Sequence, residues 1–298
     1  MNLSRRAFLK NTSIAVVGAS LAPNPFLPEK KVKHVVGIQL YSIKDDMKKD
    51  PLGTLKLLSG MGYRYVEHAN YIDRKFYGYP AQEFKKILED QNLKMLSGHT
   101  VMGKKHWDSN RKDFSDEWKF TVEDAAIVGQ KFVISPWFDE SLRKNYDDML
   151  SYMDVFNKCG ELCNKSGMKF GYHNHDFEFR ESLNNINLYD IILQNTDPKL
   201  VAQQLDIGNM YGGGGRAMDI LKKYPGRFEL IHVKDEIKAG DKYESTVIGK
   251  GIIGTKQITD LARKQGASHF IIEQESYQDK SPMDCAREDL AIIRKWGY

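Results

Sequence analysis

The sequence predicts an α/β protein with the (β/α)₈ fold, a closed TIM barrel in which each of eight parallel strands leads to a helix. Three observations support this fold class. Short apolar segments alternate with longer helical patterns eight times, which is typical of βαβ units and a parallel sheet. Segments such as FVIS (132–135) and FIIE (270–273) are almost continuously apolar, as expected of strands covered on both faces. The length of 298 residues suits one barrel of about 250 residues. An open doubly wound sheet, which usually has fewer strands, is the alternative.

The predicted elements follow one another regularly between residues 34 and 298, which we expect to form a single domain. Short apolar runs are interpreted as strands and the longer patterns between them as helices. The first four units combine strands 35–42, 63–68, 93–100 and 131–138 with helices Pro51–Met61, Ala81–Gln91, Asp116–Gly129 and Asp147–Ser166. The last four begin with strands 168–175, 200–209, 227–235 and 269–276; helices Asn185–Gln194 and Ala217–Lys223 follow the first two, and the last helical pattern ends with Ala286–Trp296.

The first 22 residues have the three parts of an export signal. Arg5 and Arg6 lie in the segment SRRAFLK, a weakly apolar run extends from Thr12 to Leu21, and small residues follow where cleavage could occur. The apolar run is shorter than the roughly 20 residues needed to span a bilayer, so no stable membrane anchor is expected. We therefore predict a twin-arginine-type signal peptide at residues 1–22, a linker at 23–33, and export to the periplasm.

The composition argues against a nucleic-acid partner. Of the 44 basic residues, three lie in the predicted signal, and the chain has 40 acidic residues, so the remaining body is almost neutral. Binding to nucleic acid would favour a clustered basic face instead. The three cysteines include no CxxC spacing, and a disulfide framework is not expected.

Polar side chains close nearly every predicted strand at its carboxyl end. In a parallel barrel these ends meet at one rim, where active sites are found. His173, Asp206, His232 and Glu273 end four successive strands in the second half of the chain. Two imidazoles and two carboxylates suit one divalent ion, Mn²⁺, Co²⁺, Zn²⁺ or Mg²⁺, with open positions for a substrate. Glu275 shares a face with Glu273, but Glu273 lies nearer the apolar strand and is the predicted ligand.

Three further polar residues are predicted to take part in catalysis. His175 and Glu178 are candidates for general acid or base, because an imidazole or a carboxyl with a raised pKa suits proton transfer near neutral pH. The alternative is that they support the metal ligands from behind. Lys234 shares a face with His232 and could hold a developing oxyanion; alternatively it forms an ion pair with Asp235 or another acid.

The other polar and aromatic residues near the strand ends are predicted to bind the substrate. Tyr41, Tyr172 and Trp137 could stack on the apolar face of a sugar ring, although aromatic residues are core residues by default. Trp137, which follows a proline at a strand end, is the most favoured of the three to be exposed. The substrate-binding candidates are Gln39, Tyr41, Glu67, His99, Trp137 and Asn209.

Six motifs resemble those of the xylose-isomerase-like TIM-barrel superfamily, the group of sugar phosphate isomerases and epimerases. They are SGHT (97–100), YHNHDFEF (172–179), LDIGN (205–209), HVKD (232–235), IGKGIIG (248–254) and IIEQE (271–275), and the resemblance covers the chain from GIQLYS onward. It implies one divalent ion held by a glutamate, an aspartate, a histidine and a second glutamate. Asp206, His232 and Glu273 match the last three. Where relatives often read ENH this chain reads HNH, so the first ligand is either His173 or Glu178.

The resemblance also implies chemistry beside a sugar carbonyl. We expect a metal-dependent sugar isomerase or epimerase that acts through an enediolate on a small, unphosphorylated carbohydrate. One alternative is a lyase that enolises 3-keto-glycosides and then eliminates the C1 substituent. The other is a periplasmic carbohydrate-binding protein without turnover. Asn209, at a position where LDxGH motifs have histidine, weighs against the abasic-site endonucleases that share this barrel. A homo-oligomer is compatible with each expectation.

Overall fold

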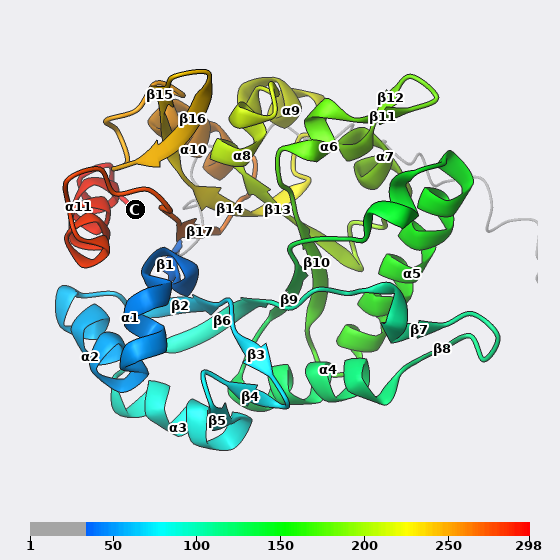
Figure 1. The fold of residues 1–298 in the computed structure, drawn as a ribbon, viewed down its shortest axis with the longest axis horizontal. Coiled ribbons are helices and arrows are strands. Elements are labelled where there is room, and N and C mark those ends of the chain that lie inside the picture. The colour runs from blue at the N-terminus through cyan, green and yellow to red at the C-terminus, as the bar shows by residue number, and fades with distance from the viewer. Residues whose placement is uncertain (1–33) are drawn as a thin grey trace, which may run out of the picture. The chain divides into compact units, whose positions relative to one another are not determined.

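The structure, a computed structural model, describes residues 34–298, which form one compact unit. Its centre is a closed barrel of eight parallel strands (Figure 1). The strands are β1 (Val35–Gln39), β2 (Tyr65–His68), β6 (Lys94–His99), β9 (Phe132–Ser135), β10 (Lys169–His173), β13 (Val201–Asp206), β14 (Phe228–Val233) and β17 (His269–Ile272). Each pairs with its predecessor, and β17 pairs with β1 from Val35 opposite His269 to Ile38 opposite Ile272. The predicted closed barrel is confirmed, and an open sheet is excluded.

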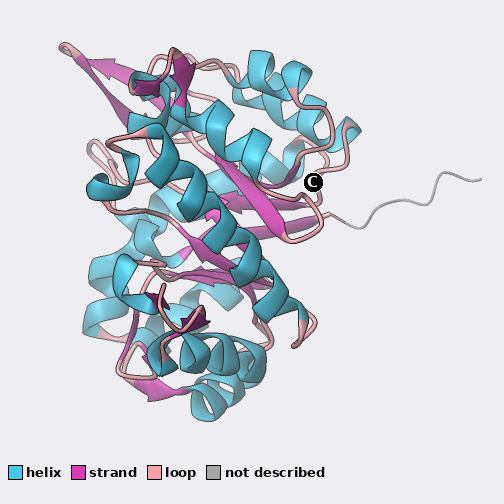
Figure 2. Cartoon of the chain, turned by 90° about the vertical axis from the view of Figure 1, so that its right-hand side faces the viewer, coloured by secondary structure: helices cyan, strands magenta, loops and turns pink. Residues whose placement is uncertain are grey.

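Helices cover the outside of the barrel, as Figures 1 and 2 show. They are α2 (Pro51–Met61), α3 (Ala81–Asp90), α4 (Asp116–Val128), α5 (Tyr146–Asn164), α7 (Leu188–Asn195), α9 (Ala217–Lys223), α10 (Thr255–Lys264) and α11 (Pro282–Lys295). Their ends follow local chemistry. The Ser115 side chain caps α4 by accepting from the backbone N–H of Trp118, and Gly129 ends it in the left-handed conformation. In the part of the chain that the structure describes, no helix is long and apolar enough to cross a membrane.

Short elements lie between the carboxyl ends of the strands and the main helices. They include the 3₁₀ helix η1 (Leu40–Ile43), the helices α1 (Lys44–Lys49), α6 (Phe177–Arg180) and α8 (Ile207–Gly212), and the hairpin β15 (Asp235–Ala239) and β16 (Lys242–Thr246). Because each immediately follows a barrel strand or a neighbouring element, these segments border the rim predicted to carry function.

One predicted helix boundary is wrong. The helix expected from Asn185 begins at Leu188, because residues 182–187 form the hairpin β11 (Ser182–Leu183) and β12 (Ile186–Asn187). Its turn consists of Asn184 and Asn185, with φ values of 50° and 62°. A two-residue hairpin turn favours positive φ at both positions, and asparagine tolerates it better than most residues. The side chain of Asn187 then caps α7.

The inside of the barrel has an apolar layer and a polar layer. Phe132, Ile134, Ala202 and Leu230 form a buried cluster separate from the main core. Along a strand the residues of one face recur every second position, so Ala202 shares its face with Gln204 and Asp206. Leu230 likewise shares its face with His232. The apolar cluster therefore fills the barrel beneath the polar side chains at the carboxyl ends, which rest on a packed floor.

The predicted export signal and linker fall within residues 1–33, which lie outside the described residues. They remain predictions.

Candidate metal centre

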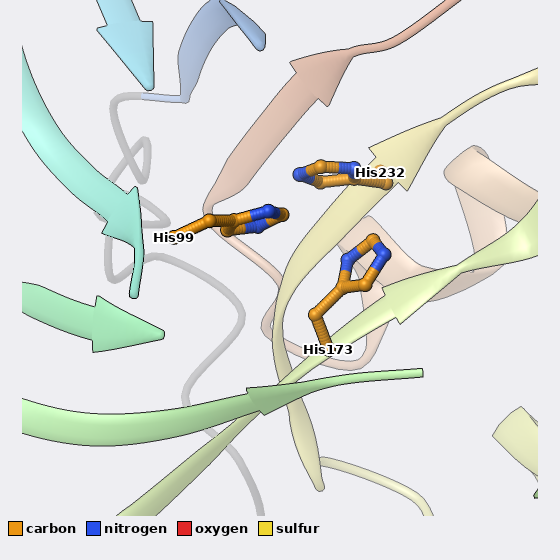
Figure 3. A group of neighbouring side chains, drawn as sticks. All are labelled: His99, His173 and His232. Atoms are coloured by element: carbon orange, nitrogen blue, oxygen red, sulfur yellow. The ribbon is translucent and has the colours of Figure 1, made fainter. Parts of the chain in front are cut away.

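Four of the predicted site residues converge at the carboxyl ends of neighbouring strands. His173 ends β10, Asp206 ends β13, His232 lies in β14, and Glu273 follows β17 directly. One ligand atom from each lies within 4.8 Å of those of the other three, and all four residues are buried. A second group, His99, His173 and His232, meets the same criterion. Figure 3 shows these three imidazole rings gathered at the strand ends.

Asp206 is the best-placed candidate ligand of the group. Its Oδ1 accepts a hydrogen bond of 2.7 Å from the backbone N–H of Asn209, and through this bond Asp206 caps helix α8. Its Oδ2 is buried without a hydrogen-bond partner. This atom lies 3.9 Å from His173 Nε2 and 3.8 Å from His232 Nδ1. The ammonium of Lys234 lies 3.2 Å from this oxygen but not in hydrogen-bonding geometry, so an ion coordinated among these donors would supply the directed contact that the oxygen lacks. The residues therefore fit one divalent metal ion.

Lys234 lies beside this group and places its positively charged ammonium next to the carboxylates. The ammonium Nζ lies 3.2 Å from both Asp206 Oδ2 and Glu273 Oε2, although not in hydrogen-bonding geometry, and donates to Glu275 Oε1 at 2.6 Å. Burial acts to lower the pKa of Lys234, but the surrounding carboxylates raise it well above its ordinary value. The predicted ion pair is present, with these three acids, and the predicted oxyanion role stays a prediction. Asp235 instead accepts from the backbone N–H of Gly249 at 2.8 Å.

Burial and neighbouring charges set the protonation of the donor groups. Burial, together with His232 and His99, holds the pKa of His173 well below its usual value, so its imidazole is neutral, as metal binding requires. Burial also acts to lower the pKa of His232, but Glu67 and Glu273 raise it to about 10. Its Nδ1 lies 3.0 Å from Glu273 Oε2. Burial raises the pKa of Asp206.

Glu67 and Gln39 correct two of the sequence-based expectations. Both were predicted to contact the substrate, but both are completely buried. Gln39 Nε2 donates to Glu67 Oε1 at 2.8 Å. The same oxygen lies 2.6 Å from His232 Nε2 and 3.1 Å from His99 Nε2. Strand ends β1 and β2 thus provide a buried hydrogen-bonding layer beneath the metal group, and neither residue lines the cavity above it.

Gln204 was not identified from the sequence. It is completely buried in β13, where it contacts Glu67 and two of the histidines. The available signal was its position two residues before Asp206, which puts both side chains on one face of the strand. A glutamine in a buried strand is not by itself a sign of function.

Glu178 lies apart from the metal group. It is completely buried; one carboxylate oxygen is hydrogen-bonded to the hydroxyl of Tyr172, and the other accepts from the backbone N–H of His175 at 2.9 Å. Burial raises the pKa of Glu178 to about 8. The group that could hold a metal contains His173 and not Glu178. Tyr172 is also completely buried, which corrects its interpretation as a sugar-stacking residue.

A cavity of about 340 Å³ opens above the metal group. Tyr41 and Trp137, with 39% and 40% of their surface exposed, border it, and Trp137 packs edge-on against His175 at 5.3 Å between ring centres. Burial lowers the pKa of His175 to about 4, so this imidazole is neutral. The lining residues are Tyr41, Ala69, His99, Val101, Pro136, Trp137, His173, His175, Asn209, Glu273 and Glu275. Five candidates predicted to bind or transform the substrate, Tyr41, His99, Trp137, His175 and Asn209, are therefore brought together here.

The family follows from a comparison with family models. Residues 55–296 match the model of the xylose isomerase-like TIM barrel. The chain belongs to this family. A solved structure from Parabacteroides distasonis ATCC 8503, named a sugar phosphate isomerase/epimerase, superposes with a TM-score of 0.76 and 24% identity over 89% of this chain and 95% of that chain. A protein named IOLI with a bound zinc atom superposes with a TM-score of 0.67 and 13% identity over 88% of this chain and 97% of that chain. At these identities both likenesses concern the fold.

Curated relatives of this xylose isomerase-like chain carry the name inosose dehydratase. The protein from Clostridium botulinum (strain Alaska E43 / Type E3) is 28% identical over 184 residues, which cover 56% of this chain and 60% of that protein. A relative from Bacillus cereus (strain AH820) is 27% identical over 218 residues, 64% of this chain and 72% of that protein. The chain thus spans 60% of the length of the first of these relatives.

Proposed function

We propose that this protein is a divalent-metal-dependent lyase that acts on an unphosphorylated carbohydrate. It removes the proton from the carbon next to a carbonyl group and then eliminates a substituent from the following carbon. The observation that carries the proposal is the Oδ2 of Asp206, which has an ion pair with Lys234 but no hydrogen bond and lies among three other buried donor groups, of which His173 and Glu273 line a polar cavity. The relatives named inosose dehydratase support elimination as the outcome.

The residues of the centre divide into ligands and proton carriers. His173, Asp206, His232 and Glu273 would hold the ion. A divalent ion bound there would act as a Lewis acid toward a carbonyl oxygen and a neighbouring hydroxyl. His175 lines the cavity as a neutral imidazole and is the group proposed to accept the proton from carbon.

Lys234 and Glu275 form the second part of the proposed machinery. The ammonium of Lys234 stays protonated and supplies positive charge beside the cavity, where an oxygen of the substrate becomes negative as the proton leaves. Glu275 lines the cavity and is held by this ion pair. Among the described residues that line the cavity, none is an arginine or a lysine, which favours a substrate without phosphate. The predicted export signal agrees with that substrate class.

An isomerase or epimerase is the second candidate. Epimerisation needs proton exchange on two faces of one carbon. His175 follows β10 and Glu275 follows β17, and β13 and β14 lie between these strands in the barrel. Proton carriers therefore reach the cavity from two separated walls, which supports re-protonation on the opposite face. The neighbours named as isomerases or epimerases have the same fold.

The two candidates differ in what happens after the carbon loses its proton. The protein loaded with Zn²⁺, Mn²⁺ or Co²⁺ would be incubated in D₂O with an inosose, with free ketoses and with 3-keto-glycosides, and followed by NMR. We expect loss of water or of the aglycone from one of these classes. Deuterium incorporated into a ketose with formation of a new isomer, and no elimination product, would replace the lyase with the epimerase.

A binding protein without turnover is the third outcome of the same experiment. It would show a bound metal and saturable carbohydrate binding, but no deuterium in any substrate.

His175→Gln is the variant that tests the proposed proton acceptor, because it keeps a polar side chain in the cavity and removes the imidazole. We expect it to abolish deuterium exchange while metal content stays at the wild-type level.

A further inference from the structure

Gln204 makes three contacts that link separate parts of the polar layer. Its Nε2 lies 2.8 Å from Glu67 Oε2. Its Oε1 lies 2.7 Å from His99 Nε2 and 3.0 Å from His173 Nδ1. Gln204 and His173 are direct partners in the ladder between β13 and β10. Paired residues of adjacent strands point to the same face, so both side chains point into the barrel.

The contact with Glu67 settles which way round the amide lies. The two ends of a glutamine amide are told apart by their partners. Glu67 already accepts hydrogen bonds at Oε1 from Gln39 Nε2 and His232 Nε2, so its carboxylate is an acceptor. The amide NH₂ of Gln204 therefore faces Glu67, and the carbonyl oxygen faces the two histidines.

That orientation decides which nitrogen of His173 carries the proton. A neutral imidazole has one N–H and one lone pair. Because the carbonyl oxygen of Gln204 can only accept, His173 donates to it from Nδ1. The lone pair then lies on Nε2, the nitrogen that is 3.9 Å from Asp206 Oδ2, an oxygen without a hydrogen bond. His99 in turn donates to Gln204 from Nε2, so this nitrogen is not free to bind an ion.

We propose that Gln204 is a positioning residue that holds His173 as the Nδ1–H tautomer and so turns this histidine into a metal ligand through Nε2. Hydrogen bonds from the second nitrogen of a histidine commonly orient metal ligands in this way. Gln204 can have this positioning role only because residue 173 is a histidine. A carboxylate at that position, as the ENH pattern would have it, has no tautomer to select. Gln204 also favours the four-residue group over the three-histidine group as the metal site. His99 Nε2 donates its proton to Gln204 and therefore has no lone pair for an ion.

The variants that test this role differ in whether they offer an acceptor to His173. Gln204→Leu removes both the acceptor and the donor. Gln204→Glu retains an acceptor for the Nδ1 proton, and because its other oxygen faces Glu67 Oε2 the two carboxylates share one proton, which replaces the lost donor. Gln203→Leu is the matched control. Gln203 is the neighbouring residue of β13 and equally buried, but it lies on the opposite face of the strand, and its amide atoms have no hydrogen-bond partner among the described residues.

The first readout is the tautomer of His173 in the metal-free protein. Two-bond ¹H–¹⁵N correlation spectra of protein labelled at the histidine rings distinguish Nδ1–H from Nε2–H, and the His173 signals are assigned by comparison with His173→Gln. We expect Nδ1–H in the wild type, in Gln203→Leu and in Gln204→Glu, and loss of this preference in Gln204→Leu. An Nε2–H tautomer in the wild type would overturn the proposal.

The second readout is metal affinity, measured with Zn²⁺ and Co²⁺ alone against a competing chelator. We expect Gln204→Leu to weaken binding about 10- to 100-fold, the usual effect of losing such an outer hydrogen bond. Gln204→Glu should recover much of this loss, and Gln203→Leu should bind as the wild type does. Wild-type affinity in Gln204→Leu, with thermal unfolding confirming that it is folded, would also overturn the proposal. Both readouts are independent of turnover, so an enzyme inactive on every carbohydrate tested would refute the proposed function and leave this inference standing.

Discussion

Two completely buried carboxylates near the carboxyl ends of the strands differ in how they are partnered. Glu67, in the first half of the barrel, has hydrogen bonds at both oxygens. Asp206, in the second half, has one oxygen capping helix α8 and one with no hydrogen-bond partner. Both follow the rule that polar groups close the strands of a barrel. The difference teaches that burial and position alone do not mark a candidate ligand, whereas a buried oxygen that lacks a hydrogen bond and faces other donor groups does.

The partners of Glu67 explain why it serves a different purpose. Its oxygens accept hydrogen bonds from Gln39, Gln204 and His232, so neither oxygen is left to accept a bond on the cavity side. The contact with His232 Nε2 directs Nδ1 of that ring toward Asp206. A carboxylate that orients a histidine in this manner is a common feature of metal sites. The first half of the barrel therefore orients side chains of the candidate ligands that the second half supplies.

The largest effect is expected where the unsatisfied oxygen is changed. Asp206→Asn removes the negative charge at the centre, but its side-chain oxygen can still accept from Asn209 N–H and preserve the start of α8. We expect Zn²⁺ affinity to fall by more than about 100-fold, beyond the effect of losing an outer hydrogen bond, and turnover to fall with it. Titration against a chelator measures the affinity. Glu275→Gln, at the rim of the cavity, is the control that should keep the metal.

Asp206→Asn also distinguishes the two groups of side chains that could hold an ion. If it bound Zn²⁺ as tightly as the wild type, His99, His173 and His232 would be the ligands instead. The oxygen of Asp206 that lacks a hydrogen bond would then not identify a metal ligand, and the difference between Asp206 and Glu67 would not bear on metal binding.

A smaller effect is expected at the satisfied carboxylate. Glu67→Gln keeps the size of the side chain but weakens acceptance from His232 Nε2, so we expect metal affinity to fall about 10- to 100-fold. The dependence on pH should change as well. Burial acts to lower the pKa of His232, and Glu67 and Glu273 raise it to about 10. Below that pH the ion must displace a proton, so wild-type affinity should rise with pH up to about 10.

In Glu67→Gln the pKa of His232 should be lower, because one of the two carboxylates that raise it is gone. The rise of affinity with pH should therefore end earlier than in the wild type. Chelator competition at several pH values measures both curves. Superimposable curves would mean that Glu67 does not act through His232.

Sequence reasoning located the strands and the direction of their ends, because both depend on short-range patterns. Apolar runs and period-two alternation are properties of neighbouring residues, and they placed His173, Asp206 and His232 correctly at strand ends. The depth of each side chain was not accessible in the same way. Gln39 and Glu67 occupy strand-end positions like the candidate ligands do, yet both are hydrogen-bonded within the buried polar layer.

The hydrogen bonds that separate ligands from supporting residues connect strands far apart in the chain. Gln204 and Glu67 are 137 residues apart and meet across the barrel. No local pattern signals such a contact, since it depends on the closure of the barrel and on the length of both side chains. The hairpin at Asn184 and Asn185 was missed for a different reason. Its turn chemistry is local, but the asparagines were interpreted as the start of a helix.

The smallest effect on the metal is expected at Glu178, a third buried carboxyl whose oxygens are both partnered, by Tyr172 and by the backbone of His175. Glu178→Gln should leave Zn²⁺ affinity unchanged, because the group already lacks acceptor capacity toward the centre. Its effect should appear in stability. Burial raises the pKa of Glu178 from 4.5 to about 8, so between these values the folded protein holds a proton that the unfolded chain releases. The free energy of unfolding of the wild type should therefore fall as pH rises from about 4.5 to about 8, and this part of the slope should be absent from the variant. Denaturant unfolding of the metal-free proteins at pH 5 and pH 8 measures the difference. A loss of metal comparable to that of Asp206→Asn would instead place Glu178 among the ligands, and saturation by hydrogen bonds would no longer separate supporting carboxylates from binding ones.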